Sequence, residues 1–232
     1  MKDNIISLRK LVKTFPVGDG VFTALNDINL DFKIGEFTGL VGPSGSGKTT
    51  LLNIIGSLDT PSEGEAWILG QDIAQLDAKE SARLRNESIG FIFQSYNLLP
   101  VYTVYENIEF ALLLQKQSKE QRHKEVMEAL EWVGLTDKAK QRPVNLSGGE
   151  CQRVSIARAM VKRPRIVLAD EPTANLDSEN SHNILRTMRK LNEELQTTFI
   201  FATHDEKIMQ YLTRTIHLKD GRFVEETYKY NK

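Results

Sequence analysis

The sequence of 232 residues predicts an α/β fold built around a mainly parallel sheet. Short, mostly apolar runs bounded by turn residues are typical of buried strands, and they occupy 37–41, 89–93, 165–169 and 198–203. Helical patterns lie between these runs, and alternating strands and helices favour parallel pairing. The stretch 95–161 is mostly helical in pattern, so we expect a helical insertion.

The N-terminal part predicts a smaller antiparallel β subdomain. Residues 5–40 read as short strands separated by turns, with a hairpin at 17–21 where Gly and Asp lie between apolar residues. Another strand is expected at 66–69, after a run of turn residues. A second hairpin is expected near the other end of the chain, at 219–221.

Three helices have clear signals. One is expected at 49–55, after a glycine-rich loop. The second begins with the capping-box spacing of Ser118 and Gln121 and ends at Gly134. The third follows strand 165–169 and carries apolar residues at helical spacing, namely Ile184, Leu185, Met188, Leu191 and Leu195.

The charge balance and the single cysteine restrict the class of protein. The chain has 30 basic and 31 acidic residues, so no nucleic-acid partner is expected. Cys151 cannot form an internal disulfide, which favours a reducing compartment. The apolar runs are far shorter than the ~20 residues of a membrane-spanning helix. We therefore expect a chain that does not cross a bilayer but can dock on a protein that does.

The most specific motif lies between strand 37–41 and helix 49–55. Its pattern of two glycines, a lysine and a threonine is that of a P-loop, in which backbone N–H groups surround phosphates. Lys48 is expected near the β/γ-phosphates, and Thr49 is expected to bind Mg²⁺. The alternative is a Gly/Ser-rich surface loop. The predicted ATP contacts are Gly42, Pro43, Ser44, Gly45, Ser46, Gly47, Lys48, Thr49 and Thr50.

Two acidic residues follow strand 165–169. Asp170 is expected to be a direct or indirect Mg²⁺ partner, because ligands of α/β folds bind at the carboxyl ends of strands. Glu171 is placed to polarise the attacking water. The alternative is a solvated acidic turn before Pro172.

A glycine-rich helix start occupies 146–150. Ser147 and Glu150 have the spacing of a capping box, so an ordinary capped helix is one interpretation. That interpretation leaves Gly148 and Gly149 unexplained, because each glycine in a helix costs up to ~1 kcal/mol relative to alanine. A helix start that approaches an anion would use glycine there.

The segment 146–150 resembles the signature motif of ATP-binding-cassette (ABC) ATPases, and the order of the other motifs agrees over essentially the whole chain. Phe15 resembles the aromatic residue that stacks on adenine, and Gln94 resembles the Q-loop glutamine, which implies catalytic and Mg²⁺ roles. Asp177 resembles the D-loop aspartate, and His204 resembles the histidine that contacts the γ-phosphate. Each of these residues alone has a structural alternative. Phe15 could be a core or edge aromatic residue and Gln94 a surface or capping amide. Asp177 could cap the following helix, and His204 could be a structural histidine.

The resemblance implies a domain plan and a homodimer. A core at 1–94 and 162–232 would carry the P-loop, and a helical subdomain at 95–161 would carry the signature. The signature of one copy, with Ser147, Gly148, Gly149 and Glu150, would cover ATP held by the other. Two departures are visible, since Glu150 stands where glutamine is common and Phe15 where tyrosine is common. Neither departure removes a phosphate contact.

The segments 58–61, 89–100 and 168–177 look like the ATPases of the lipoprotein-releasing and macrolide-exporting group. This implies a separate integral membrane permease, and a cytoplasmic subunit that is peripheral on the inner membrane. The cell-division ATPase of similar sequence stays open as an alternative. A soluble P-loop kinase would have no use for 146–150, and a DNA-repair ATPase would usually carry a long coiled coil instead of the short stretch between Gln94 and Leu146.

Overall fold

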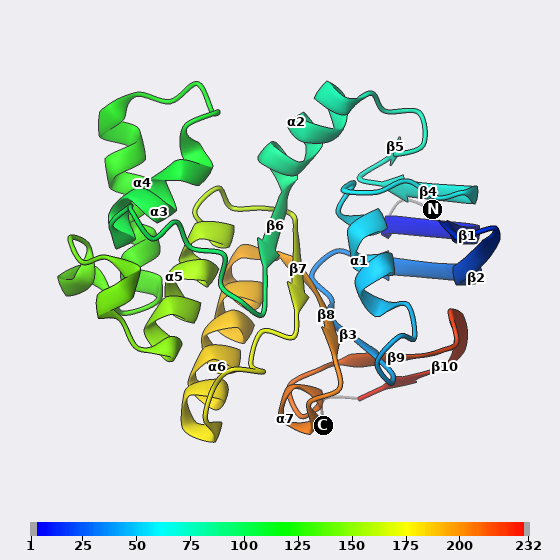
Figure 1. Cartoon of the computed structure of the whole chain (residues 1–232). Coiled ribbons are helices and arrows are strands. Elements are labelled where there is room, and N and C mark those ends of the chain that lie inside the picture. The colour runs from blue at the N-terminus through cyan, green and yellow to red at the C-terminus, as the bar shows by residue number, and fades with distance from the viewer. Residues whose placement is uncertain (1–3, 230–232) are drawn as a thin grey trace.

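A computed structural model describes residues 4–229, which form two sheets and a group of helices (Figure 1). The larger sheet has six strands in the order β10-β9-β3-β8-β7-β6. Five of them are parallel, and only the edge strand β10 runs antiparallel, so the predicted mainly parallel sheet is confirmed. The strands are β3 (Phe37–Val41), β6 (Ile89–Ile92), β7 (Ile166–Asp170), β8 (Thr198–Thr203), β9 (Arg214–Lys219) and β10 (Arg222–Tyr228).

The smaller sheet is antiparallel, with the order β2-β1-β4-β5. It contains β1 (Asn4–Val17), β2 (Gly20–Lys33), β4 (Glu63–Ile68) and β5 (Gln71–Asp72). The hairpin expected at 17–21 is present, since Val17 pairs with Gly20. The expectation of short strands was wrong, because β1 and β2 each run for 14 residues. Register shifts interrupt the pairing of β1 with β2 at several points, and these interruptions make each long strand look like several short strands in the sequence.

Helix α1 (Lys48–Ile55) lies between the two sheets (Figure 1). Its Leu51, Ile54 and Ile55 are fully buried and belong to a core that also includes side chains from both sheets. The glycine-rich loop before α1 is therefore held between β3 and a packed helix. This fixes the N-terminus of α1 at the edge of the larger sheet.

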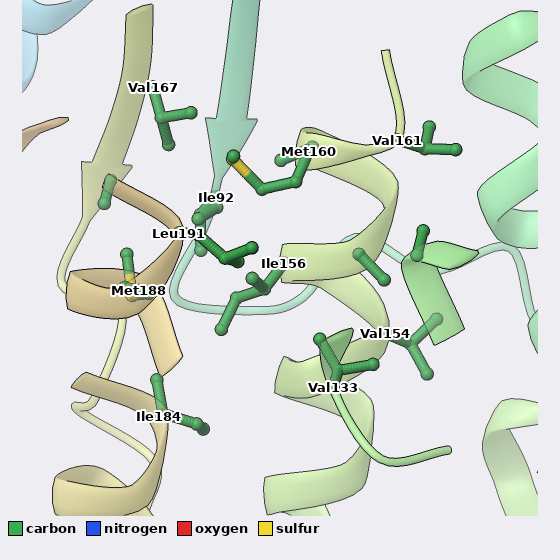
Figure 2. Packing of buried hydrophobic residues seen from close by; sticks show 14 of the residues in the cluster. Ile92, Val133, Val154, Ile156, Met160, Val161, Val167, Ile184, Met188 and Leu191 are labelled. Carbon is green, nitrogen blue, oxygen red and sulfur yellow. The ribbon is translucent and has the colours of Figure 1, made fainter. Parts of the chain in front are cut away.

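The helical insertion contains α3 (Val104–Glu109), α4 (Lys119–Trp132) and α5 (Gly148–Met160), joined by loops and single 3₁₀ turns. Ser118 caps α4 as predicted by accepting from the Gln121 amide, whereas the C-cap is Val133 and the expected Gly134, with φ +65°, comes one residue later. A second core joins α5 to α6 (Ser178–Leu195) and to strands β6 and β7 (Figure 2). Ile156 and Met160 of α5 lie there near Met188 and Leu191 of α6. The insertion is thus packed onto the sheet through α5.

Two helices were not predicted, namely α2 (Ala78–Ser88) and α7 (Glu206–Met209). Helix α2 buries only Leu84, so it has almost no apolar periodicity. Its capping box, formed by Asp77 and Glu80, was the signal that could have revealed it. Within residues 4–229, no helix has both the length and the apolar character needed to cross a bilayer.

Candidate nucleotide-binding site

A cleft of about 410 Å³ lies at the carboxyl edge of the larger sheet. The loop after β3, the end of β7, the residue after β8 and the segment after β6 all reach it, because parallel strands end at the same edge. Sequence positions more than 150 residues apart therefore line one cleft. Its lining residues are Phe22, Ala24, Ser44, Gly45, Gly47, Lys48, Thr49, Thr50, Gln94, Asp170, Glu171 and His204.

The loop at 42–47 has the backbone of a phosphate cradle. Gly45 and Gly47 have φ of +78° and +97°, which residues with side chains rarely adopt. The Lys48 ammonium donates to the carbonyls of Gly42 (2.8 Å) and Pro43 (2.9 Å). Burial lowers the pKa of Lys48, while Glu171 and Asp170 act in the opposite direction. The cation is thus folded back over its own loop, in a position to meet an anion in the cleft.

Three predicted loop residues do not line the cleft, namely Gly42, Pro43 and Ser46. Ser46 is 2% exposed, and its hydroxyl has no hydrogen-bond partner among the residues that the structure describes.

Oxygen ligands gather beside the cradle. The Thr49 hydroxyl donates to Oδ2 of Asp170 at 3.1 Å, and Gln94 lines the same cleft. Burial raises the pKa of Asp170. A hydroxyl, a carboxylate and an amide oxygen are hard ligands of the kind that Mg²⁺ binds, usually with one or two carboxylates completed by phosphate and water. Between residues 4 and 229 no group of three or more His, Cys, Asp or Glu side chains is placed to hold a metal ion.

Glu171 is held in a strained and specific position. Its φ is +45°, a region that costs a non-glycine residue about 1–2 kcal/mol. Its amide donates to the Ala202 carbonyl, and its carboxylate accepts from the Thr203 hydroxyl at 3.2 Å. The other carboxylate oxygen lies 2.6 Å from Nδ1 of His204. These contacts from β8 aim a carboxylate at the cleft, and strain of this kind is commonly found at functional sites.

The aromatic side chain in the cleft is not the one that the sequence indicated. Phe15 does not line the cleft, whereas Phe22 does. The two residues face each other across the β1–β2 hairpin, and the Lys13 ammonium lies 5.0 Å from the Phe15 ring centroid. Phe22 is 53% exposed, so its ring is available to a ligand. The sequence signal for Phe22 was its place opposite Phe15 across the predicted turn.

The glycine-rich helix start does not reach this cleft within one chain. Ser147 and Glu150 form the predicted capping box at the start of α5, with Ser147 accepting from the Glu150 amide and Glu150 accepting from the Ser147 amide. A Cβ on Gly149 would lie 2.7 Å from Oδ1 of Asn180. One on Gly148 would lie 3.0 Å from the Tyr96 hydroxyl. Both glycines therefore have a packing reason within the chain, which sequence reasoning did not find.

Asp177 also lies outside the cleft lining. Its carboxylate caps α6 by accepting from the backbone and side-chain amides of Asn180, at 2.9 and 2.6 Å. The structural alternative for Asp177, a helix N-cap, is thus present. Nearby, the side-chain amide of Asn175 donates to the backbone carbonyl of Gln94 at 2.9 Å. The segment after β7 is therefore tied to the segment after β6.

Comparison with known proteins agrees with this arrangement. The family model described as "ABC transporter" matches residues 25–174, more than half of the chain. The ABC transporter ATP-binding protein MJ0796 of Methanocaldococcus jannaschii is 43% identical over 96% of each chain. Its structure, described as a dimeric post-hydrolysis state bound to ADP and Pi, has a TM-score of 0.90 at 42% identity and covers 98% of this chain and 100% of its own.

Two other relatives belong to named systems. The lipoprotein-releasing system ATP-binding protein LolD of Pseudomonas fluorescens is 40% identical over 95% of this chain and 97% of its own. The macrolide export ATP-binding/permease protein MacB of Burkholderia thailandensis is 42% identical over 97% of this chain, which spans only 34% of MacB. The cleft, the fold and these relatives agree, and the chain belongs to the ABC transporter family of ATP-binding ATPases.

Proposed function

We propose that this chain binds MgATP in the cleft and hydrolyses it as a homodimer to drive a separate membrane permease. The observation that carries the proposal is the meeting of Lys48, Thr49, Asp170, Glu171 and His204 at one edge of the sheet. Together they offer a cation, oxygen ligands and a positioned carboxylate, which are the parts that phosphoryl transfer needs.

The loop and Lys48 bind the phosphates. Backbone N–H groups at 44–50 and the N-terminus of α1 attract anions. The Lys48 ammonium exchanges its two carbonyl partners for phosphate oxygens, which are charged and bind it more strongly. Phe22, assisted by Phe15 beside it, supplies an apolar face for the base.

Thr49, Asp170 and Gln94 are the residues that would hold Mg²⁺ next to the phosphates. When bound, Mg²⁺ neutralises the charge of the β- and γ-phosphates. The raised pKa of Asp170 fits this role, because a buried carboxylate without a cation is less stable as an anion.

Glu171 acts on the attacking water. Its carboxylate accepts a proton as the water oxygen bonds to the γ-phosphorus, and the bond to the leaving ADP oxygen breaks. His204 and Thr203 hold that carboxylate in place through the contacts from β8. His204 is 74% exposed at its side chain, so it is also free to turn toward the γ-phosphate.

A second copy would complete the site. The helix start with Ser147, Gly148, Gly149 and Glu150 does not line the chain's own cleft, which supports a role toward a neighbour's nucleotide. Asp177 would lie at the same contact. The dimeric structures described for MJ0796, at 42% identity, support this assembly.

The permease would dock beside the segment after Gln94. A groove of about 280 Å³ lies there, with Phe93, Phe110 and Arg158 among its lining residues. Leu99 and Tyr102 are exposed nearby, whereas Leu98 packs against the core. The helical subdomain proposed at 95–161 would thus face the partner, while the core at 1–94 and 162–232 holds the nucleotide.

The relationship to LolD and MacB favours an export or extracytoplasmic-release system for a lipoprotein, macrolide or peptide. It also favours a subunit that is peripheral on the cytoplasmic face of the inner membrane. A membrane-bound cell-division complex is the second candidate. Purification of the membrane partner and identification of its family would separate the two.

The variant Glu171→Gln tests the catalytic proposal. It should bind ATP with unchanged affinity and hydrolyse it about 10²- to 10⁴-fold more slowly, the usual contribution of a general base. Glu193→Gln on the exposed surface of α6 is the control and should hydrolyse ATP at the normal rate. Normal turnover by Glu171→Gln would show that another group activates the water.

A further inference from the structure

Three backbone segments lie against one another beside the cleft. They are the phosphate loop at 42–47, strand β2, and the turn between β9 and β10. The Gly221 amide in this turn donates to the Ser46 carbonyl of the loop at 3.2 Å. The Gly221 carbonyl accepts from the Asn26 amide of β2 at 2.8 Å. Gly221 therefore bridges the loop and β2 with its own backbone, although it does not line the cleft.

The three segments are too close for side chains between them. A Cβ on Gly42 would overlap the Leu218 carbonyl oxygen. A Cβ on Gly47 would lie 2.7 Å from the Ala24 carbonyl oxygen, and one on Gly221 would lie 2.6 Å from the same oxygen. Real Cβ atoms do not approach that closely. A side chain at any of these three positions would force the turn, β2 or the phosphate loop to move.

We infer that Gly221 is a positioning residue of the nucleotide site, which holds the phosphate loop in register with the strand that carries Phe22 and Ala24. The inference rests on the ATP binding proposed above. Phe22 and Ala24 line the cleft together with Gly47, so the turn sets the spacing between the apolar face for the base and the cradle for the phosphates. A ligand that spans both parts is sensitive to that spacing.

The variant Gly221→Ala tests this role. The added methyl group meets the Ala24 carbonyl, so the turn moves away and the bond to Ser46 is lost. We expect ATP to bind at least about tenfold more weakly, the effect of roughly 1.4 kcal/mol, in titrations with a fluorescent ATP analogue. Wild-type protein binds normally in the same assay, so failure of the wild type would instead refute the proposed ATP site.

Gly70→Ala is the matched control. Gly70 has φ +79°, close to the +72° of Gly221, but a Cβ there meets nothing within 4 Å. Both variants suffer the same backbone strain, and Gly221→Ala should show the larger fall in melting temperature because its new methyl group also meets the Ala24 carbonyl. Only Gly221→Ala should lose affinity for ATP. Equal affinity of the two variants, whether normal or reduced, would overturn the inference.

A measurement on the unaltered chain covers the case in which Gly221→Ala does not fold. Hydrogen exchange of the Gly221 and Asn26 amides should slow when ADP saturates the protein, because the loop that they hold becomes fixed. The β4–β5 turn around Gly70 should show no change. Unchanged exchange at Gly221 and Asn26, in protein shown to be saturated, would contradict the positioning role.

Discussion

Replacement of Lys162 by methionine should stabilise the fold in a pH-dependent manner. Lys162 follows α5 in the groove proposed for the permease, and its ammonium donates to the Arg85 carbonyl at 2.6 Å. Burial, with a smaller contribution from Arg85, lowers the pKa of Lys162 from its ordinary value of 10.5 to about 8. The folded state therefore binds the proton less strongly than the unfolded chain does.

The direction and size of the change in stability follow from the difference in proton binding between the folded and unfolded states. At pH 7 the lysine is charged in both states, and the fall in pKa corresponds to about 3 kcal/mol of lost stability at about 1.4 kcal/mol per tenfold change in proton affinity. This penalty disappears as the pH rises from about 8 to about 10.5, because the unfolded state then binds more protons. Methionine removes the penalty at every pH.

Urea unfolding at several pH values tests this. The stability of Lys162→Met relative to the wild type should be greatest near pH 7 and should fall by about 3 kcal/mol by pH 10.5. Lys190→Met, on the exposed face of α6, is the control for the loss of a surface lysine. A constant difference for Lys162→Met would refute the reasoning that burial has shifted this group.

Two predictions concern the nucleotide directly. Lys48→Ala should lose nucleotide binding in equilibrium dialysis, because the cleft then lacks its phosphate-facing ammonium; normal affinity would mean that the cradle is misassigned. Phe22→Ala should weaken binding of a fluorescent ATP analogue more than Phe15→Ala does, by about five- to tenfold for the loss of roughly 1 kcal/mol of base stacking. Equal effects, or a larger one at Phe15, would restore the sequence-based choice.

The parallel strands were predictable because burial on both faces makes them short apolar runs. β3 has the bounds that the sequence indicated, and β7 and β8 agree to within a residue. The polar residues that follow them could be assigned to one cleft because parallel strands end together. Helix α2 could not be found in this way, since a helix that buries only Leu84 has no apolar stripe.

Contacts between distant segments were the part that the sequence did not reveal. Gly148 and Gly149 were interpreted as letting the helix start approach an anion, and the sequence did not reveal that Tyr96 and Asn180 also lie close to them. Similarly, the pairing of Glu171 with His204 depends on the neighbouring ends of β7 and β8. Such contacts are set by the packing of segments that the local pattern cannot bring together.

Gly148 and Gly149 leave room for Tyr96 and Asn180 within the chain, and we propose that they also face a neighbour's nucleotide. Within a single chain, Tyr96 and Asn180 lie close to the start of α5, and its capping box is formed. A helix N-terminus held in this way can receive an anion without a large change in its own structure.

The central claim is that the cleft is half of an active site, completed by the α5 start of a second copy. The most direct measurement is the mass of Glu171→Gln by sedimentation, with and without MgATP, because slow hydrolysis preserves the nucleotide that joins the copies. We expect a monomer without ATP and a dimer with it. We also expect that Ser147→Arg, at the start of α5, binds ATP normally but stays monomeric in the same background. A Glu171→Gln monomer saturated with ATP would contradict the claim.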